Sequence, residues 1–231
     1  MDETGEFRGF GPGALGFLTD LAANNDREWF RANEATYLRE VKHPLIGLVT
    51  DLSEALAMRG IPLGGDPKRA LFRIHRDIRF SPDKRPYKTN AGAVLTRDGA
   101  KSAPGVLYVH LAPDGCFLAA GFHWPDSPTL ASIRESIVDR PEEWRSAIDA
   151  LGAHGLSLSR ERMLQRLPRG FDSAAVGDLA DDLRLTSFTV HLDVADDATG
   201  GPGLVGVVTG FAEASMPLLE FGWRAIGRED A

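Results

Sequence analysis

The chain has 231 residues, of which 43% are hydrophobic and 26% are charged, a composition typical of a protein with a packed core. No apolar run approaches the ~18 residues that a membrane helix needs. The acidic start, MDETGEFRGFGPG, lacks the basic and apolar regions of a signal peptide. A net charge of −7 argues against a protein that coats nucleic acid, and the single cysteine, Cys116, excludes an internal disulfide. We therefore expect a soluble, cytoplasmic protein in which Cys116 is a buried, inert thiol.

The first quarter of the chain predicts three helices. A leucine at every third position predicts a helix over 14–23 that ends at Asn24, since asparagine tolerates a left-handed cap. Asp26 is the expected N-cap of the second helix. Pro44 opens the third helix, whose leucines and valine share one face, and Gly60 ends it.

The middle of the chain changes to the period of strands. Apolar and polar residues alternate over 72–80, and 91–96 also has a strand pattern. Residues 106–111 and 116–122 flank Pro113-Asp114-Gly115, which predicts a hairpin. Because no helices separate these strands, the pattern favours an α+β fold: an antiparallel sheet from the middle of the chain, packed by N-terminal helices and a C-terminal helix.

The last part of the chain mixes both patterns. We expect helices around 130–138 and 141–151, a strand pair over 156–167 with Met163 and Leu164 facing inward, a short acidic helix capped by Asp172, a strand over 187–194, a loop over 196–203 and a helix over 211–221. No linker is long enough to divide the chain. The prediction is therefore one domain over 1–231, with a core of about 7–221 and short flexible termini.

Positive charge is concentrated in one segment, Lys68 to Lys88, which reads KRALFRIHRDIRFSPDKRPYK. It holds eight Lys or Arg residues and two Asp residues, so its net charge is +6 and the remaining residues carry −13. Clustered Arg and Lys side chains are the groups with which proteins hold phosphates, carboxylates and polyanions. The segment therefore indicates where an anion would bind without naming the anion.

The alternation of side chains on a strand assigns faces within this segment. One face carries Arg73, His75, Asp77 and Arg79. Arg76 falls on the apolar face, where a buried guanidinium must be paired, so a carboxylate such as that of Glu28 should lie opposite it.

After the turn at Ser81-Pro82-Asp83-Lys84, the chain can fold back over this basic face and complete a pocket for a phosphate or carboxylate. His75, the one plausible proton carrier, and Asp77 are the candidate catalytic residues. The expected ligand-binding residues are Arg73, Arg76, Arg79, Lys84, Tyr87 and Lys88. Replacing Arg79 or Lys88 by alanine should abolish anion binding and leave folding intact.

Two other functions fit the same segment. The basic face could be an interaction module for nucleic acid or an acidic protein partner, although the −13 balance elsewhere disfavours nucleic acid. Alternatively, the arginines have a purely structural role and join the sheet to the helices through internal ion pairs. Whether the protein is an enzyme stays open, as do its ligand, its oligomeric state and which face of the basic strand is exposed to solvent.

Three histidines in the sheet region raise the question of a metal. If Pro113-Asp114-Gly115 closes the hairpin tightly, Ala112 lies opposite Cys116 and His110 opposite Leu118. His123 then falls on the other face of the sheet from His110, unless a bulge intervenes. The chain has no HxH, HExxH or CxxC spacing, so we expect no metal site. It also lacks the phosphate-loop, dinucleotide-binding and nucleophile-elbow motifs, so we expect no cofactor.

Five blocks of the chain resemble the signatures of the domain of unknown function 2461 family, in order and spacing. They are Phe7-Arg-Gly-Phe10, Asn24-Asn-Asp-Arg-Glu-Trp-Phe30, Leu71-Phe-Arg-Ile-His-Arg-Asp-Ile-Arg-Phe80, Asp83-Lys-Arg-Pro-Tyr-Lys88 and Pro168-Arg-Gly-Phe-Asp172. The resemblance implies a single-domain, bacterial-type protein and transfers no catalytic residues. One departure concerns 173–187, which is acidic here, whereas the family pattern is more basic and includes a histidine.

Overall fold

The computed structural model describes residues 6–172 and 176–227. The chain divides into two compact units. Unit 1 comprises Met1–Ala103, Leu107–Leu118 and Asp193–Gly210, and unit 2 comprises Pro104–Val106, Ala119–Leu192 and Phe211–Ala231. Strands β2, β3 and β4 and helix α10 continue from one unit into the other. The single domain over 1–231 stays a prediction.

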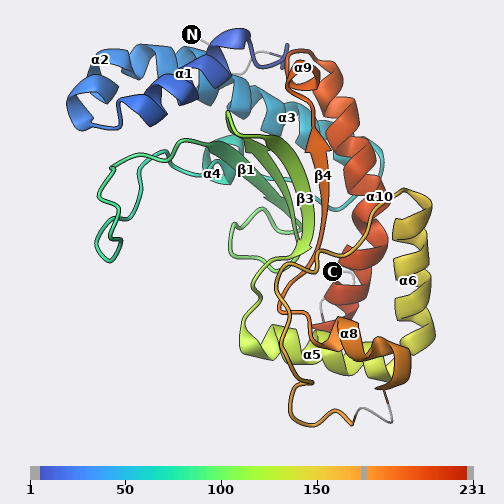
Figure 1. The fold of residues 1–231 in the computed structure, drawn as a ribbon. Helices are drawn as coiled ribbons and strands as arrows, with labels where there is room; N and C mark the ends of the chain where they lie inside the picture. Colours follow the sequence, from blue (N-terminus) through green and yellow to red (C-terminus); the bar gives the residue numbers. More distant parts are fainter. Residues whose placement is uncertain (1–5, 173–175, 228–231) are drawn as a thin grey trace. The chain divides into compact units, whose positions relative to one another are not determined.

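The predicted fold class, α+β, is confirmed (Figure 1). Four antiparallel strands form one sheet in the order β1-β2-β3-β4. The strands are β1 (Ala91–Thr96), β2 (Val106–Leu111), β3 (Cys116–Phe122) and β4 (Phe188–Val194). The prediction for residues 91–96 is confirmed because all six residues of β1 are buried and form a regular strand.

The three helices predicted for the first quarter of the chain are present in unit 1: α1 (Pro12–Ala23), α2 (Arg27–Tyr37) and α3 (His43–Met58). Asp26 caps α2 by accepting hydrogen bonds from the amides of Glu28 and Trp29. A π-helical turn, η1 (Leu38–Lys42), joins α2 directly to α3, which packs against β1. Asn24 ends α1 with a φ of −126°, so the left-handed cap expected there is wrong.

The predicted hairpin is present, but its register differs from the expected one. Strand β2 ends at Leu111 and β3 begins at Cys116, so the loop has four residues, and its Gly115 N–H donates to the carbonyl of Ala112. His110 stacks on Phe117, with ring centroids 4.4 Å apart, and does not lie opposite the buried Leu118. A pattern of apolar residues does not fix the length of the loop. One residue more or less in the loop shifts the register of the strands and changes which side chains lie opposite one another.

The regular strand predicted for residues 72–80 does not form. Only isolated bridges occur there, between Leu71 and Ala93 and between His75 and Tyr87. Among the apolar side chains of this segment, Ile74 is buried, whereas Phe72 and Phe80 are 40% and 93% exposed. Residues 71–90 instead make an arm, the teal segment that extends beyond β1 in Figure 1.

Unit 2 contains α5 (Ser127–Asp139) and α6 (Pro141–Ala153), which confirms both predicted helices, together with the first residues of β4 and most of α10 (Gly203–Ala225). Helix α10 packs closely on β3 at Gly222, where an added Cβ would lie 2.1 Å from the Phe122 ring. The strand pair expected over 156–167 does not form. Leu158 and Met163 make only isolated bridges, to Val190 and Leu185, and Leu164 is exposed, so the inward placement of its side chain is wrong.

The acidic segment follows this region. The Asp172 carbonyl accepts a hydrogen bond from the amide of Val176, but the start of the helix that Asp172 was expected to cap falls on 173–175, outside the described residues. Next come η2 (Gly177–Leu179), a 3-10 turn, and α8 (Ala180–Leu183). The loop expected over 196–203 begins with a short helix, α9 (Asp196–Thr199).

Helix α10 is long and apolar enough to cross a membrane, which the sequence pattern did not predict. Its most apolar 18-residue window has a mean hydropathy of 1.3, and 56% of that window is buried inside the protein. The core helix of a soluble protein meets the same criterion, so this observation is weak evidence for a membrane span.

Candidate functional site

The basic segment begins on the short helix α4 (Pro67–Ala70), which lies against α3 and β1 in unit 1. Asp66 caps α4 by accepting hydrogen bonds from the amides of Lys68 and Arg69, at 2.9 and 3.1 Å. After the helix the chain turns along the edge strand β1, and the amide of Phe72 donates to the carbonyl of Gly92. These contacts fix the first part of the segment beside the sheet.

The arm folds back on itself beyond this point. Arg76 donates its N–H to the carbonyl of Pro86, and Lys88 donates its N–H to the carbonyl of Ile74, both at 2.8 Å. Tyr87 is buried, and its ring stacks on Phe30 of α2 with centroids 4.2 Å apart. The return of the chain after the turn therefore places Lys88 close to the base of the arm.

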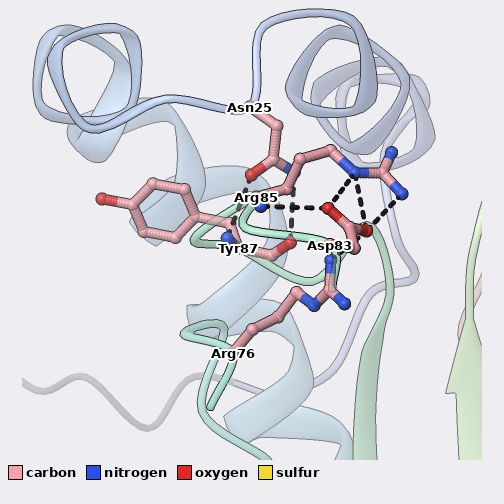
Figure 2. Close-up of polar contacts among 5 residues, drawn as sticks. All are labelled: Asn25, Arg76, Asp83, Arg85 and Tyr87. Atoms are coloured by element: carbon pink, nitrogen blue, oxygen red, sulfur yellow. Dashed lines mark hydrogen bonds and ion pairs between the residues drawn. The ribbon is translucent and has the colours of Figure 1, made fainter. Parts of the chain in front are cut away.

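Figure 2 shows how the side chains of the arm pair. Asp83 accepts hydrogen bonds from Arg76 at 2.5 Å and from Arg85 at 2.7 Å. The carboxylate expected opposite Arg76 is therefore present, but it belongs to Asp83 and not to Glu28. The hydrogen bonds from Arg85, and then those from Arg76, hold the pKa of Asp83 well below its usual range.

The other half of the arm is also paired internally. Asp77 accepts hydrogen bonds from the Arg79 side chain at 3.0 and 2.7 Å, and these bonds lower the pKa of Asp77. Lys84 donates from Nζ to the carbonyl of Ile78 at 3.1 Å. Two acids thus pair with the three arginines of the distal arm, defined here as residues 76–85, and balance two of its four positive charges.

A second group of positive charges lies at the base of the arm. A depression of about 670 Å³, the basic pocket, opens there within unit 1. Its cationic side chains outnumber its one carboxylate by five to one. The lining residues are Lys68, Arg69, Leu71, Phe72, Arg73, Lys88, Asp98, Gly99, Ala100 and Lys101.

Three of these cations act on one another. Burial lowers the pKa of Lys88, and the positive charge of Arg73 lowers it further. Burial also lowers the pKa of Lys101, with added repulsion from Lys88 and Arg73. Within residues 6–172 and 176–227, neither Arg73 nor Lys88 makes an ion pair with a carboxylate. A bound anion would relieve this repulsion between like charges.

The structure brings together only two of the predicted ligand-binding residues, Arg73 and Lys88, as walls of the basic pocket. Arg76, Arg79 and Lys84 lie on the distal arm, and Tyr87 packs in the core. Neither candidate catalytic residue lines the pocket: His75 packs beside Tyr87, and Asp77 is paired with Arg79.

Sequence reasoning missed Lys101, whose Nζ donates to the carbonyl of Leu71. It comes from the loop after β1, and the two partners are thirty positions apart, so no local signal in the sequence indicates this contact. Phe72 was also missed as a pocket residue because the expected strand placed it on the buried face. Its half-exposed ring contacts Nζ of both Lys88 and Lys101, at 5.3 and 5.0 Å from the centroid.

Two further expectations concern metals and Cys116. Across the described residues, no three His, Cys, Asp or Glu side chains are grouped so that they could hold a metal ion. Cys116 is buried, as predicted, and burial raises the pKa of its thiol. A raised thiol pKa fits an inert cysteine, since the thiolate is the reactive form.

Comparison with known proteins gives a family and no established activity. Residues 13–221 match the family model described as "Conserved hypothetical protein (DUF2461)", which spans both compact units. No curated protein and no solved structure matches the chain. The matched range covers most of the sequence, from α1 to the last turns of α10. The chain therefore belongs to the DUF2461 family.

Proposed function

We propose that this protein binds a small anion, or the phosphate group of a phosphate ester, in the basic pocket. The observation that carries the proposal is the contrast within one segment. Asp77 and Asp83 pair with the arginines of the distal arm, whereas Arg73 and Lys88 face a depression where cations outnumber the carboxylate. A cluster in which cations outnumber carboxylates is the arrangement expected where a ligand supplies further negative charge.

Each cation has a distinct part in the proposed site. The guanidinium of Arg73 offers a planar pair of donors that suits two oxygens of one phosphate or carboxylate. Lys88 and Lys101 add point charges, and the Phe72 ring lies beside both ammonium groups. Because burial weakens the hydration of the two lysines, their attraction for an anion is stronger than that of lysines in open solvent.

Thermal melting against a ligand panel tests the proposal. The panel contains inorganic phosphate, sugar phosphates, nucleotides, carboxylates and divalent metals. A ligand at ~100 times its Kd should stabilise the protein by about 2.7 kcal/mol. Arg73→Gln should remove the response to phosphate, whereas the matched control Arg79→Gln, on the distal arm, should keep it. Equal responses in both variants would overturn the assignment to the basic pocket.

A second candidate function is an interaction surface for nucleic acid or an acidic protein partner. The observation in its favour is Phe80, which is 93% exposed on the distal arm with the Arg79 guanidinium 5.9 Å from its ring centroid. Aromatic rings beside arginines can stack on bases. Binding to a polyanion should weaken steeply as salt rises, and Phe80→Leu should weaken it, whereas phosphate binding in the basic pocket should not depend on Phe80.

The composition also supports a proposed cytoplasmic location, because one buried cysteine fits a reducing compartment. Cell fractionation with an antibody against the native chain would test this location. Recovery of the protein with the membrane fraction would contradict it and would draw attention to α10.

A further inference from the structure

We infer that the ligand of the basic pocket is a nucleotide, whose phosphate contacts the lysines and whose base lies on the ring of Phe72. This inference rests on the proposed function and deepens it, because it names the class of molecule that carries the phosphate group. The pocket, Phe72 and the neighbouring aromatic residues of β2 and β3 all belong to unit 1.

Phe72 is the aromatic residue of the basic pocket. The residue is 40% exposed although its backbone is fixed by the hydrogen bond to Gly92 on β1. The ammonium nitrogens of Lys88 and Lys101 lie 5.3 and 5.0 Å from the ring centroid. An anion held by both lysines is therefore beside the ring, and the group attached to that anion must pass over or along Phe72.

More aromatic rings continue from Phe72 across the sheet. The Tyr108 ring meets Phe72 edge-on at 5.9 Å, and Phe117 lies 5.9 Å from Tyr108. His110 stacks on Phe117, and its Nδ1 is 2.9 Å from the Tyr108 hydroxyl. These rings are half-buried, whereas the residues that alternate with them on β2 are buried, so the row lies on the face of the sheet away from the core.

The Tyr108 ring fits against β1 because Gly92 has no side chain. A Cβ at Gly92 would lie 2.6 Å from the Tyr108 hydroxyl, so any larger residue would displace the tyrosine. An aromatic row that starts at a cation cluster suits a ligand with a phosphate at one end and a planar group at the other. Aromatic side chains on an antiparallel sheet are a common platform for nucleotide bases.

The size of the pocket fits the same ligand class. Its volume of about 670 Å³ lies in the range of roughly 300–1,000 Å³ that is usual for small-molecule sites. Inorganic phosphate alone would leave most of this space filled with water. A nucleotide would occupy it and cover the exposed part of Phe72, which removes apolar surface from water.

Isothermal titration calorimetry with three probes tests the inference: AMP, ribose 5-phosphate and inorganic phosphate. We expect AMP to bind on the order of tenfold more tightly than ribose 5-phosphate, because only AMP has a base to stack. Phe72→Leu should remove this preference and leave phosphate affinity within about twofold. Phe80→Leu, an equally drastic change on the distal arm, should leave the preference intact.

The outcomes separate this inference from the proposed function. If phosphate and ribose 5-phosphate bind but AMP has no advantage, the nucleotide inference is wrong and the anion site stands. If none of the three binds, both are wrong. A single-stranded oligonucleotide is the last probe: if it binds while AMP does not, the ligand is a nucleic acid and not a free nucleotide.

Discussion

Asn25 binds the backbone of Tyr87 through both ends of its side-chain amide. Its Nδ2 donates to the Tyr87 carbonyl at 3.1 Å, and its Oδ1 accepts from the Tyr87 N–H at 3.0 Å (Figure 2). The Asn25 side chain thus satisfies the N–H and the carbonyl of Tyr87, as a neighbouring strand would. Because Lys88 follows directly in the chain, the corner between α1 and α2 helps to position one wall of the basic pocket.

Replacing Asn25 by alanine tests this link. The change leaves two backbone groups of Tyr87 without their partner, so the free energy of unfolding should fall by roughly 1–3 kcal/mol. Asn24→Ala is the matched control, since the Asn24 side chain donates to one exposed carbonyl, that of Asp20. Urea denaturation of both variants measures the difference. Equal losses would show that the contact with Tyr87 contributes nothing specific.

Replacing either of two glycines of α10 by alanine should change the stability of the protein in opposite directions. Gly222→Ala would place a Cβ 2.1 Å from Phe122, and the overpacking should cost roughly 1–3 kcal/mol. Gly210→Ala meets no atom within 4 Å and should stabilise the helix by up to about 1 kcal/mol. Thermal melting of both variants compares the two. A stabilised Gly222→Ala variant would contradict the close packing of α10 on β3.

The ion pairs of Asp83 predict a pH dependence with a defined sign. Its pKa in the folded protein lies below the ordinary value of 3.8, first because of Arg85 and then because of Arg76. The stabilisation is therefore complete above the ordinary pKa and is lost as the pH falls through the lowered one. A carboxyl-carbon NMR titration measures the pKa of Asp83, which should rise more in Arg85→Gln than in Arg76→Gln. The reverse order would mean that Arg76 dominates.

Replacing Lys88 by methionine should raise the stability of the protein and weaken its binding of an anion. The lowered pKa of Lys88 means that the charged form is disfavoured by folding. This penalty is present below the folded pKa and disappears as the pH rises through it toward the unfolded value. Lys88→Met should therefore melt at a higher temperature than the wild type at pH 7, and the difference should shrink above pH ~10. A lower melting temperature at pH 7 would indicate that the Lys88 ammonium is already compensated within the protein.

The elements that the sequence predicted well are those with local signals. Strand β1, the two strands of the hairpin, and helices α1, α5 and α6 each follow from the spacing of apolar residues and from a cap or turn residue beside them. The segment over 72–80 has the same alternation but fails as a strand, since the arm extends past β1 and Phe80 reaches no core to pack against. Periodicity indicates which residues can share a face, and tertiary contacts decide whether that face is buried.

The candidate site was half predictable for the same reason. Charge density located the segment and included Arg73 and Lys88, but it could not tell which cations would find a carboxylate. The pairs of Asp77 with Arg79 and Asp83 with Arg85 join residues only two positions apart, but Arg76 and Asp83 are seven positions apart and meet only because the arm folds back on itself. Lys101 needed the three-dimensional fold, because the loop after β1 brings it to Leu71.

The most direct test of the central claim is equilibrium dialysis of labelled inorganic phosphate against the wild type, Lys88→Gln and Lys84→Gln. Both variants remove one lysine from the same segment, but only Lys88 lines the basic pocket, while Lys84 donates to a backbone carbonyl on the distal arm. The account predicts that Lys88→Gln weakens phosphate binding by roughly tenfold or more and that Lys84→Gln changes it by less than about twofold. Equal loss in both variants, or no phosphate binding by the wild type, would contradict it.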